Sequence, residues 1–140
     1  MWFNPIMRWL VSSPLHFLVS KSIMLMTYQG RRTGQTYTVP MNYLAVGDTL
    51  YTISSKDRVW WRNLQSEAYV RLRLRGKDVS ARARAIVEAD QVAKDLRLMI
   101  ETAPRMGRFF GIRMDNAGAP DSEDIARLAS QKVMVRSHIQ

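Results

Sequence analysis

One glycine-bounded segment of the chain gathers cationic and hydroxyl side chains of the kind that bind anions. Arg31, Arg32 and Thr33 lie between Gly30 and Gly34 and separate two apolar runs. Because glycine adopts positive φ at little cost, we expect a tight turn here. Guanidinium groups and free backbone amides in such a turn suit a phosphate or a carboxylate. The alternative is a solvated hairpin turn that carries arginine because the whole protein is basic.

A second candidate for anion binding stands at the end of a later apolar run. Ser54, Ser55 and Lys56 precede a short helical stretch and supply hydroxyl groups, an ammonium group and backbone amides. Amides at a helix start attract phosphate, so the segment has the composition of a phosphate cradle. A plain loop leading into a helix explains the same residues, and both interpretations stay open.

Two adjacent tryptophans, Trp60 and Trp61, open that helical stretch. Neighbouring side chains on a helix point about 100° apart, so one indole can enter the core while the other borders a ligand. The alternative places both rings in the core or in a contact between subunits. Asn63 follows one turn later, and we expect its amide to hold a neighbouring loop.

A strand pair expected over residues 69–75 and 79–87 alternates between apolar and polar side chains. The inward face of its second strand carries Ala81, Ala83 and Ala85. The outward face of the pair carries arginine at Arg71, Arg73, Arg75, Arg82 and Arg84. Such a face suits a nucleic-acid backbone, but it lacks the interleaved aromatic rings of a stacking platform. We therefore expect a solvated outer face and do not expect nucleic acid as a partner.

The composition limits the chemistry that side chains can perform alone. The 140-residue chain has no cysteine and only two histidines, His16 and His138, which excludes thiolate chemistry and disulfides and argues against any metal site. No catalytic triad or carboxylate pair stands at a recognisable spacing. If the protein is an enzyme, a bound cofactor must supply the reaction. The formal charge of +9 and a pI near 10.5 attract anions such as nucleic acid, anionic lipid or a phosphorylated small molecule, and a solvated basic surface explains the same charge.

Periodicity and turn residues predict an α+β, mainly antiparallel barrel with flanking helices. Strands are expected over residues 23–28, 36–45, 49–54, 69–75, 79–87 and 132–138, the first three as a meander. A short helical stretch is expected over 60–67. Asp90 is expected to cap a helix that ends at Pro104, and Asp121 or Ser122 to cap a second helix. The basic and aromatic stretch over 105–116 remains unassigned.

A single domain is expected over residues 1–140, with an N-terminal helical segment (1–20) and a barrel with inserted helices (21–140). No segment reaches the roughly 20 apolar residues that span a membrane, and the N-terminus lacks the features of a signal peptide. We therefore expect a cytoplasmic protein. The amphipathic N-terminal helix either packs on the barrel or contacts the inner face of the membrane peripherally.

Several motifs together resemble the deazaflavin-dependent nitroreductase family. They run in order from Ser13-Pro14-Leu15-His16 and Ile23-Met24-Leu25-Met26-Thr27 through Gly30-Arg31-Arg32-Thr33-Gly34, Val39-Pro40 with Tyr43, and Gly47-Asp48 to Trp60-Trp61-Arg62-Asn63-Leu64. Each motif alone has little specificity, whereas their shared order and spacing over residues 4–90 is fairly specific.

The resemblance implies a split β-barrel related to the pyridoxamine-phosphate oxidase and FMN-binding barrels, often dimeric. It also implies coenzyme F-420, a deazaflavin that donates hydride to quinones, nitroaromatics or other activated acceptors. Carried over by position, the family's cofactor contacts fall on Arg31, Arg32 and Thr33 for the anionic tail, Val39, Pro40 and Asn42 along the cofactor, Ser54, Ser55 and Lys56 for the phosphate, and Trp60 and Trp61 at the pocket border. Ser54 and Tyr43 are the candidate contacts of the acceptor.

The chain departs from the family in the loop before Trp60. Only Asp57, Arg58 and Val59 separate Lys56 from Trp60, where the family has a longer loop that contains glycine. Glycine lets a backbone approach phosphate closely, so its absence keeps other ligands open. The alternatives are an FMN-dependent reductase, a non-catalytic carrier of flavin or another ligand, and a polyanion-binding protein that uses the arginine face.

Overall fold

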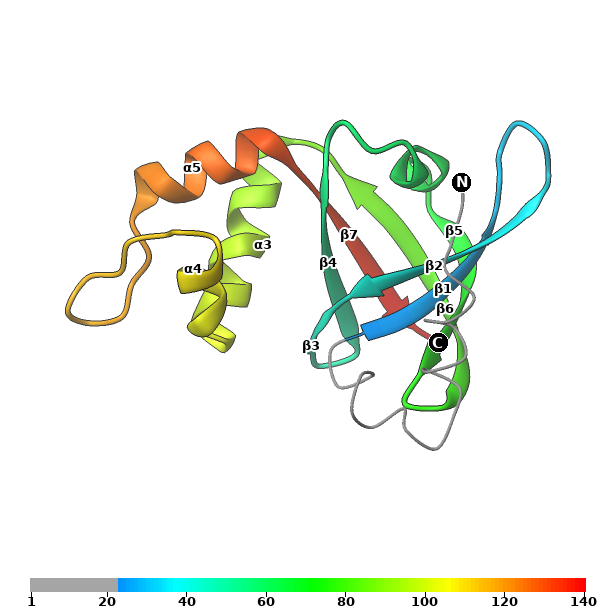
Figure 1. Ribbon diagram of the computed structural model, residues 1–140, viewed down its shortest axis with the longest axis horizontal. Coiled ribbons are helices and arrows are strands. Elements are labelled where there is room, and N and C mark those ends of the chain that lie inside the picture. Colours follow the sequence, from blue (N-terminus) through cyan, green and yellow to red (C-terminus); the bar gives the residue numbers. More distant parts are fainter. Residues whose placement is uncertain (1–22) are drawn as a thin grey trace.

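Seven antiparallel strands form one curled sheet in the computed structural model, which describes residues 23–140 (Figure 1). Their order across the sheet is β2-β1-β5-β6-β7-β4-β3. The strands are β1 (Ile23–Gln29), β2 (Thr36–Asn42), β3 (Leu44–Val46), β4 (Thr49–Ser55), β5 (Ala68–Leu74), β6 (Lys77–Ile86) and β7 (Lys132–Ile139). The sequence-based fold class, a mainly antiparallel split barrel with flanking helices, is confirmed.

The two edge strands of the sheet are consecutive in the chain. β2 ends at Asn42 and β3 begins at Leu44, so Tyr43 alone separates them. Asn42 pairs with Ile23 of β1, whereas Leu44 pairs with Tyr51 of β4. Figure 1 shows β2 crossing from the β1–β2 turn to β3 at the opposite edge. The sheet must therefore curl until its edges approach each other at Tyr43.

The expected three-strand meander is wrong in its middle strand. The apolar pattern over residues 36–45 continues through the corner at Tyr43, but the two halves pair at opposite edges of the sheet. Alternation indicates which face a side chain takes and says nothing about a change of partner strand. The last strand is closer to expectation, since residues 132–138 lie within Lys132–Ile139.

A short 3-10 helix, η1 (Trp60–Leu64), packs against the barrel core and is shorter than the expected stretch over 60–67. Trp60 and Trp61 are both buried, with 8% and 6% exposure, in the same cluster as the inward alanines of β6. Small side chains on β6 leave room for the indole rings, so the predicted inward alanines are confirmed. Both indoles therefore join the core, and Trp60 in addition lines a pocket described below.

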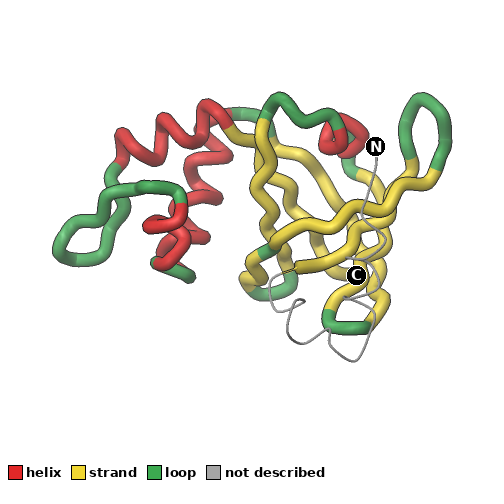
Figure 2. Tube along the Cα trace, viewed as in Figure 1, coloured by secondary structure: helices red, strands yellow, loops and turns green. Residues whose placement is uncertain are grey.

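Residues 87–131 leave the sheet between β6 and β7 and form a helical arm of α3 (Ala89–Thr102), α4 (Arg105–Phe109) and α5 (Ser122–Gln131). Figures 1 and 2 show this arm beside β4 and β7. Its apolar side chains form a second core with the outer face of the sheet, including Leu96, Ile125 and Met134. Met134 of β7 pairs in register with Ile86 of β6, so the arm leaves and rejoins the sheet at neighbouring points.

One predicted helix cap is confirmed and the other is wrong. Asp121 is the N-cap of α5, and its carboxylate accepts a hydrogen bond from the Asp124 amide at 3.0 Å. Asp90 does not cap α3, because the cap position is Glu88 and Asp90 lies in the first turn. A carboxylate in the first turn is favourable because this end of a helix is positive. Asp90 therefore indicated the first turn of α3 and not its cap residue.

No helix within residues 23–140 is long and apolar enough to cross a bilayer. The helices expected over 1–20 lie outside the described residues, as does their packing on the barrel or on a membrane. Those expectations stay predictions.

A bidentate ion pair joins the arm to the barrel. Nε and Nη2 of Arg136 on β7 donate to Oδ2 and Oδ1 of Asp95 on α3 at 2.7 and 2.9 Å. The Asp95 side chain is 8% exposed and that of Arg136 is 35% exposed. Bidentate pairing fixes the relative orientation of the two planar groups and satisfies a buried carboxylate. The pair therefore holds α3 against the outer face of β7.

The substitution Asp95→Asn should lower the free energy of unfolding by about 2 kcal/mol, because it leaves Arg136 without its carboxylate. Urea denaturation at neutral pH measures the difference. The double variant Asp95→Leu, Arg136→Met is the matched control and should recover much of the loss, since no charge is then left unpaired. An unchanged stability in Asp95→Asn would show that the ion pair does not hold the arm.

A second charged cluster surrounds Asp124 at the start of α5. Nε and Nη2 of Arg113 donate to its Oδ2 and Oδ1 at 3.0 and 3.1 Å, and the Arg113 amide donates to Oδ2 at 2.9 Å. These hydrogen bonds lower the pKa of Asp124 from 3.8 to about 2. The carboxylate therefore fastens the segment around Arg113 to α5.

Acid should loosen this contact in a defined range. Because the pKa of Asp124 in the folded protein lies below its ordinary value of 3.8, its stabilisation is complete above that value and is lost as the pH falls toward about 2. Thermal unfolding followed by circular dichroism between about pH 5 and about pH 2 measures the loss. Asp124→Asn lacks this titration, so its melting temperature should fall less steeply. Equal slopes in the two proteins would contradict the assignment.

Candidate functional site

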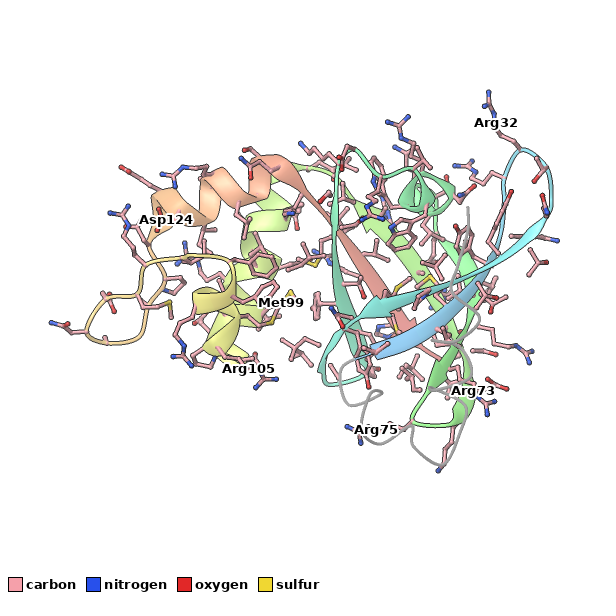
Figure 3. All side chains as sticks on the ribbon, viewed as in Figure 1. Arg32, Arg73, Arg75, Met99, Arg105 and Asp124 are labelled. Carbon is pink, nitrogen blue, oxygen red and sulfur yellow. The ribbon has the colours of Figure 1, made fainter. Side chains whose placement is uncertain are left out.

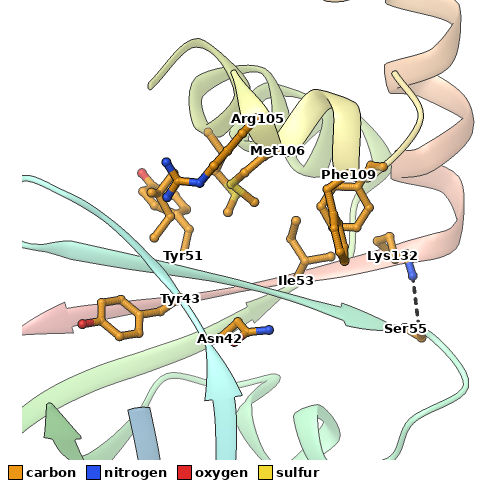
Figure 4. A pocket seen from close by; sticks show the side chains of 12 residues that line it. Asn42, Tyr43, Tyr51, Ile53, Ser55, Arg105, Met106, Phe109 and Lys132 are labelled. Atoms are coloured by element: carbon orange, nitrogen blue, oxygen red, sulfur yellow. Dashed lines mark hydrogen bonds between the residues drawn. The ribbon is translucent and has the colours of Figure 1, made fainter. Parts of the chain in front are cut away.

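A pocket of about 500 Å³ lies between the outer face of β4 and helix α4 (Figure 4). We call it the arm pocket, and its lining residues are Asn42, Tyr43, Leu44, Tyr51, Ile53, Ser55, Met99, Arg105, Met106, Phe109, Phe110 and Lys132. Figure 4 shows Arg105 and Lys132 well apart across the pocket, with apolar and aromatic side chains between them. A volume of this order and a mainly apolar lining suit a flat organic ligand.

β4 places its outward side chains along one wall of the arm pocket. Strand alternation directs Tyr51, Ile53 and Ser55 toward α4. Ser54 points into the barrel, where it is 8% exposed and accepts a hydrogen bond from Trp60 Nε1 at 3.1 Å. Ser54 therefore lines neither this pocket nor the one described below, and of the two serines only Ser55 reaches a pocket.

Lys132 enters the arm pocket from β7, where it is the register partner of Ser55. Its Nζ donates to Ser55 Oγ at 3.1 Å, the contact drawn as a dashed line in Figure 4. Within residues 23–140 no carboxylate forms an ion pair with Lys132. The pocket thus contains a half-buried cation held in place by a neutral hydroxyl group.

An exposed aromatic ring stands at the edge of the arm pocket. Phe109 is 82% exposed although it lines the pocket. It meets Phe110 edge to face, with ring centroids 5.0 Å apart and planes at 88°. A ring held in this way offers its free face for stacking on a planar ligand.

Tyr51 contributes a protonated hydroxyl group to the arm pocket. Burial raises its pKa above 10.0, the nearby Asp95 carboxylate raises it further, and Arg136 acts in the opposite direction. The hydroxyl therefore keeps its proton at neutral pH and is available as a hydrogen-bond donor.

A second pocket, of about 630 Å³, lies between the β1–β2 turn and η1. We call it the turn pocket, and its lining includes Arg31, Arg32, Thr33, Trp60 and Asn63. Both arginines are exposed, and Figure 3 shows Arg32 extending outward from the tip of the turn. This pocket presents positive charge toward solvent.

Asn63 fixes the turn that carries these arginines. Its Oδ1 accepts a hydrogen bond from the Arg31 amide at 3.0 Å, and its Nδ2 donates to the Trp60 carbonyl at 3.1 Å. The sequence-based expectation that Asn63 holds a neighbouring loop is confirmed. Gly30 is required in the same turn, because a Cβ atom there would lie 2.8 Å from the Tyr37 ring.

Helix η1 connects the two pockets. Trp61 Nε1 donates to the carbonyl of Ser55, at the Lys132 end of the arm pocket, at 3.2 Å. Asn63 contacts the turn pocket through Arg31. Helix η1 therefore contacts a lining residue of each pocket, Ser55 in one and Arg31 in the other.

The residues that the resemblance assigned to one cofactor site are divided between these pockets. The turn pocket brings together Arg31, Arg32, Thr33 and Trp60, and the arm pocket brings together Asn42, Tyr43 and Ser55. The remaining candidates, Val39, Pro40, Ser54, Lys56 and Trp61, line neither pocket.

Several residues of the arm pocket were not predicted from the sequence, above all Tyr51, Arg105, Phe109 and Lys132. Lys132 stands 77 positions from its partner Ser55, and no local pattern indicates that register. The basic and aromatic composition over 105–116 was the available signal for α4, but it did not identify the element.

The arginine face of the β5–β6 hairpin is partly neutralised. Arg73 pairs with Asp78 at 3.0 Å and Arg82 with Glu67 at 3.4 Å. This face therefore offers a polyanion fewer unpaired arginines than the sequence suggests.

The curled sheet and its outer pocket define a split β-barrel protein, and solved structures share this fold. An F420-H2 dependent reductase has a TM-score of 0.53 and 16% identity, covering 86% of this chain and 95% of that one. A general stress FMN/FAD binding protein of Xanthomonas citri has a TM-score of 0.51 and 15% identity, covering 88% and 78%. A structure described as a domain-swapped dimer has a TM-score of 0.55 and 16% identity, covering 86% and 82%.

Residues 10–109 match the model of the family described as F420H(2)-dependent quinone reductase. The chain belongs to the F420H(2)-dependent quinone reductase family, which confirms the resemblance to deazaflavin-dependent proteins. No curated protein sequence matches the chain.

The substitution Asn63→Leu should release the turn that carries Arg31. Loss of the side-chain acceptor removes a hydrogen bond worth about 1 kcal/mol, so protection of the Arg31 amide from hydrogen exchange should fall about fivefold. Exchange measured by NMR tests this. Asn63→Asp keeps an Oδ acceptor and serves as the control. Equal protection in Asn63→Leu and the unsubstituted protein would contradict the assigned contact.

Proposed function

We propose that the protein is a reductase that uses coenzyme F-420, a deazaflavin, to reduce a small, flat, electron-poor acceptor such as a quinone or a nitroaromatic compound. Family membership supports the class of cofactor. The observation that carries the proposal is the arm pocket, which combines an apolar wall, an exposed Phe109 and cations in about 500 Å³.

The residues present fit the chemistry of this cofactor. Its flat ring system requires an apolar pocket with an aromatic surface, and the arm pocket supplies Ile53, Met106 and Phe109. Its tail ends in carboxylates, which suit the guanidinium groups of Arg31 and Arg32 in the turn pocket. Helix η1 contacts a lining residue of each pocket, and the proposal is that one extended ligand occupies both.

When bound in its reduced form, the deazaflavin supplies a hydride. The side chains of the arm pocket have other tasks: Ile53 and Met106 exclude water, and Phe109 covers a planar ring. The protonated hydroxyl of Tyr51 can donate a hydrogen bond to an oxygen atom of the acceptor. Tyr43 lines the same pocket and remains the acceptor contact that the sequence suggested, whereas Ser54 lies inside the barrel.

Self-association belongs to the same proposal. One solved structure with this fold is described as a domain-swapped dimer, which supports a homodimer here. Sedimentation velocity of the purified chain distinguishes a dimer from a monomer. A cytoplasmic location is likewise proposed from the sequence.

The proposal is tested by titrating the purified protein with coenzyme F-420 and, separately, with FMN. We expect saturable quenching of deazaflavin fluorescence at micromolar concentrations and weaker binding of FMN. Adding a quinone or a nitroaromatic compound to protein and reduced coenzyme should then restore the absorbance of the oxidised deazaflavin. Preference for FMN would reassign the cofactor, binding without turnover would indicate a carrier, and binding of neither would remove the proposal.

Matched variants locate the tail of the ligand. The double substitution Arg31→Gln, Arg32→Gln should weaken binding about tenfold and reduce its salt dependence, because two charge-assisted contacts are lost. Arg71→Gln, Arg84→Gln removes the same charge from the exposed outer face and should bind as the unsubstituted protein does. Equal losses in both variants would show that only net charge matters.

A further inference from the structure

We propose that Lys132, held by Ser55, forms the site for the phosphate group of the cofactor, in place of the loop at Lys56. This inference rests on the proposed function and concerns which of this chain's residues meet the phosphate. The shared chemistry is that of an oxyanion, which can belong either to the cofactor or to a negatively charged acceptor.

Two backbone amides of the loop that follows β4 already donate hydrogen bonds within the protein. The Lys56 amide donates to the Gln131 carbonyl at 3.4 Å, and the Arg58 amide donates to the Ser55 carbonyl at 3.1 Å. The Lys56 side chain is exposed and lines neither pocket. These two amides are therefore not available to a phosphate, which weakens the case for a phosphate cradle in this loop.

Lys132, unlike Lys56, is partly buried and lines a pocket. Its ammonium group lies in the arm pocket, half-buried, and donates to Ser55 Oγ at 3.1 Å. An ammonium group has three donors, and within residues 23–140 no carboxylate pairs with this one. A half-buried cation without a counter-charge is favourable when a ligand brings the negative charge.

The order of groups along the cofactor matches the order of sites along the protein. In the cofactor the phosphate stands between the flat ring and the carboxylate tail. In the protein Ser55 borders the arm pocket and is bonded to η1 through Trp61, and η1 is bonded to the arginine turn through Asn63. Lys132 and Ser55 therefore lie at the end of the arm pocket that is hydrogen-bonded to η1, and η1 in turn holds the arginine turn.

Two deazaflavins that differ in the phosphate provide the test. One is coenzyme F-420, and the other is its deazariboflavin precursor, which lacks the phosphate and everything beyond it. Lys132→Gln should weaken binding of coenzyme F-420 about tenfold or more, the loss of one charge-assisted contact, and change binding of the precursor less than about twofold. Fluorescence titration measures both affinities without any turnover. Lys132→Arg keeps the charge and should restore most of the affinity.

Lys56→Gln is the matched control, since it removes the neighbouring lysine from the exposed loop. It should bind both deazaflavins as the unsubstituted protein does, and a selective loss for coenzyme F-420 in Lys56→Gln but not in Lys132→Gln would overturn the assignment. A loss for both ligands in Lys132→Gln would also overturn it, because the lysine would then act on the ring or on the fold.

The remaining outcomes separate this inference from the proposed function. If Lys132→Gln binds coenzyme F-420 normally but has a raised KM for anionic acceptors only, the oxyanion is that of the acceptor and the phosphate assignment falls. If the unsubstituted protein binds neither deazaflavin, the proposed function fails and this inference fails with it.

Discussion

The structure depends on a strand that is covered on both faces. β4 directs Leu50, Thr52 and Ser54 into the barrel, and it directs Tyr51, Ile53 and Ser55 toward the arm. Each of the two serines of β4 accepts a hydrogen bond from another element. Ser54 accepts one from Trp60 of η1, and Ser55 accepts one from Lys132 of β7. A slip of one residue would exchange the two sets and place apolar and polar groups on the wrong sides. The register of the barrel therefore determines the chemistry of the arm pocket.

Local features of the sequence were sufficient for much of the fold. Alternation identified the β5–β6 hairpin and its inward alanines, Asp121 identified the start of α5, and Asn63 identified the loop contact. Each of these signals lies in the residue types of a few neighbouring positions. Some residues that the family resemblance assigned to the cofactor line the turn pocket and others line the arm pocket, because its motifs run through β1, β2 and η1.

The rest of the site depended on contacts between distant segments. The alternation of side chains does not reveal the corner at Tyr43. The sequence therefore predicted one long strand where the structure has β2 and β3 at the two edges of the sheet. Ser54 and Ser55 look equivalent in sequence, and only the inward direction of one and the outward direction of the other separates them. Phe109 enters the pocket from α4, in the arm that the second core and the Asp95–Arg136 pair hold against the sheet. Lys132 enters it from β7, where its position follows from pairing with β4.

The arm is one continuous excursion between two neighbouring strands. Because Ile86 and Met134 are paired, residues 87–131 leave the sheet and return to it without crossing any other strand connection. This excursion supplies one wall of the arm pocket, while β4 and the tryptophan helix belong to the rest of the chain. A change confined to this segment would therefore alter one wall of the arm pocket and leave the wall formed by β4 unchanged. Grafting the excursion from one relative onto another would exchange this wall while the pairing of the barrel strands stays the same.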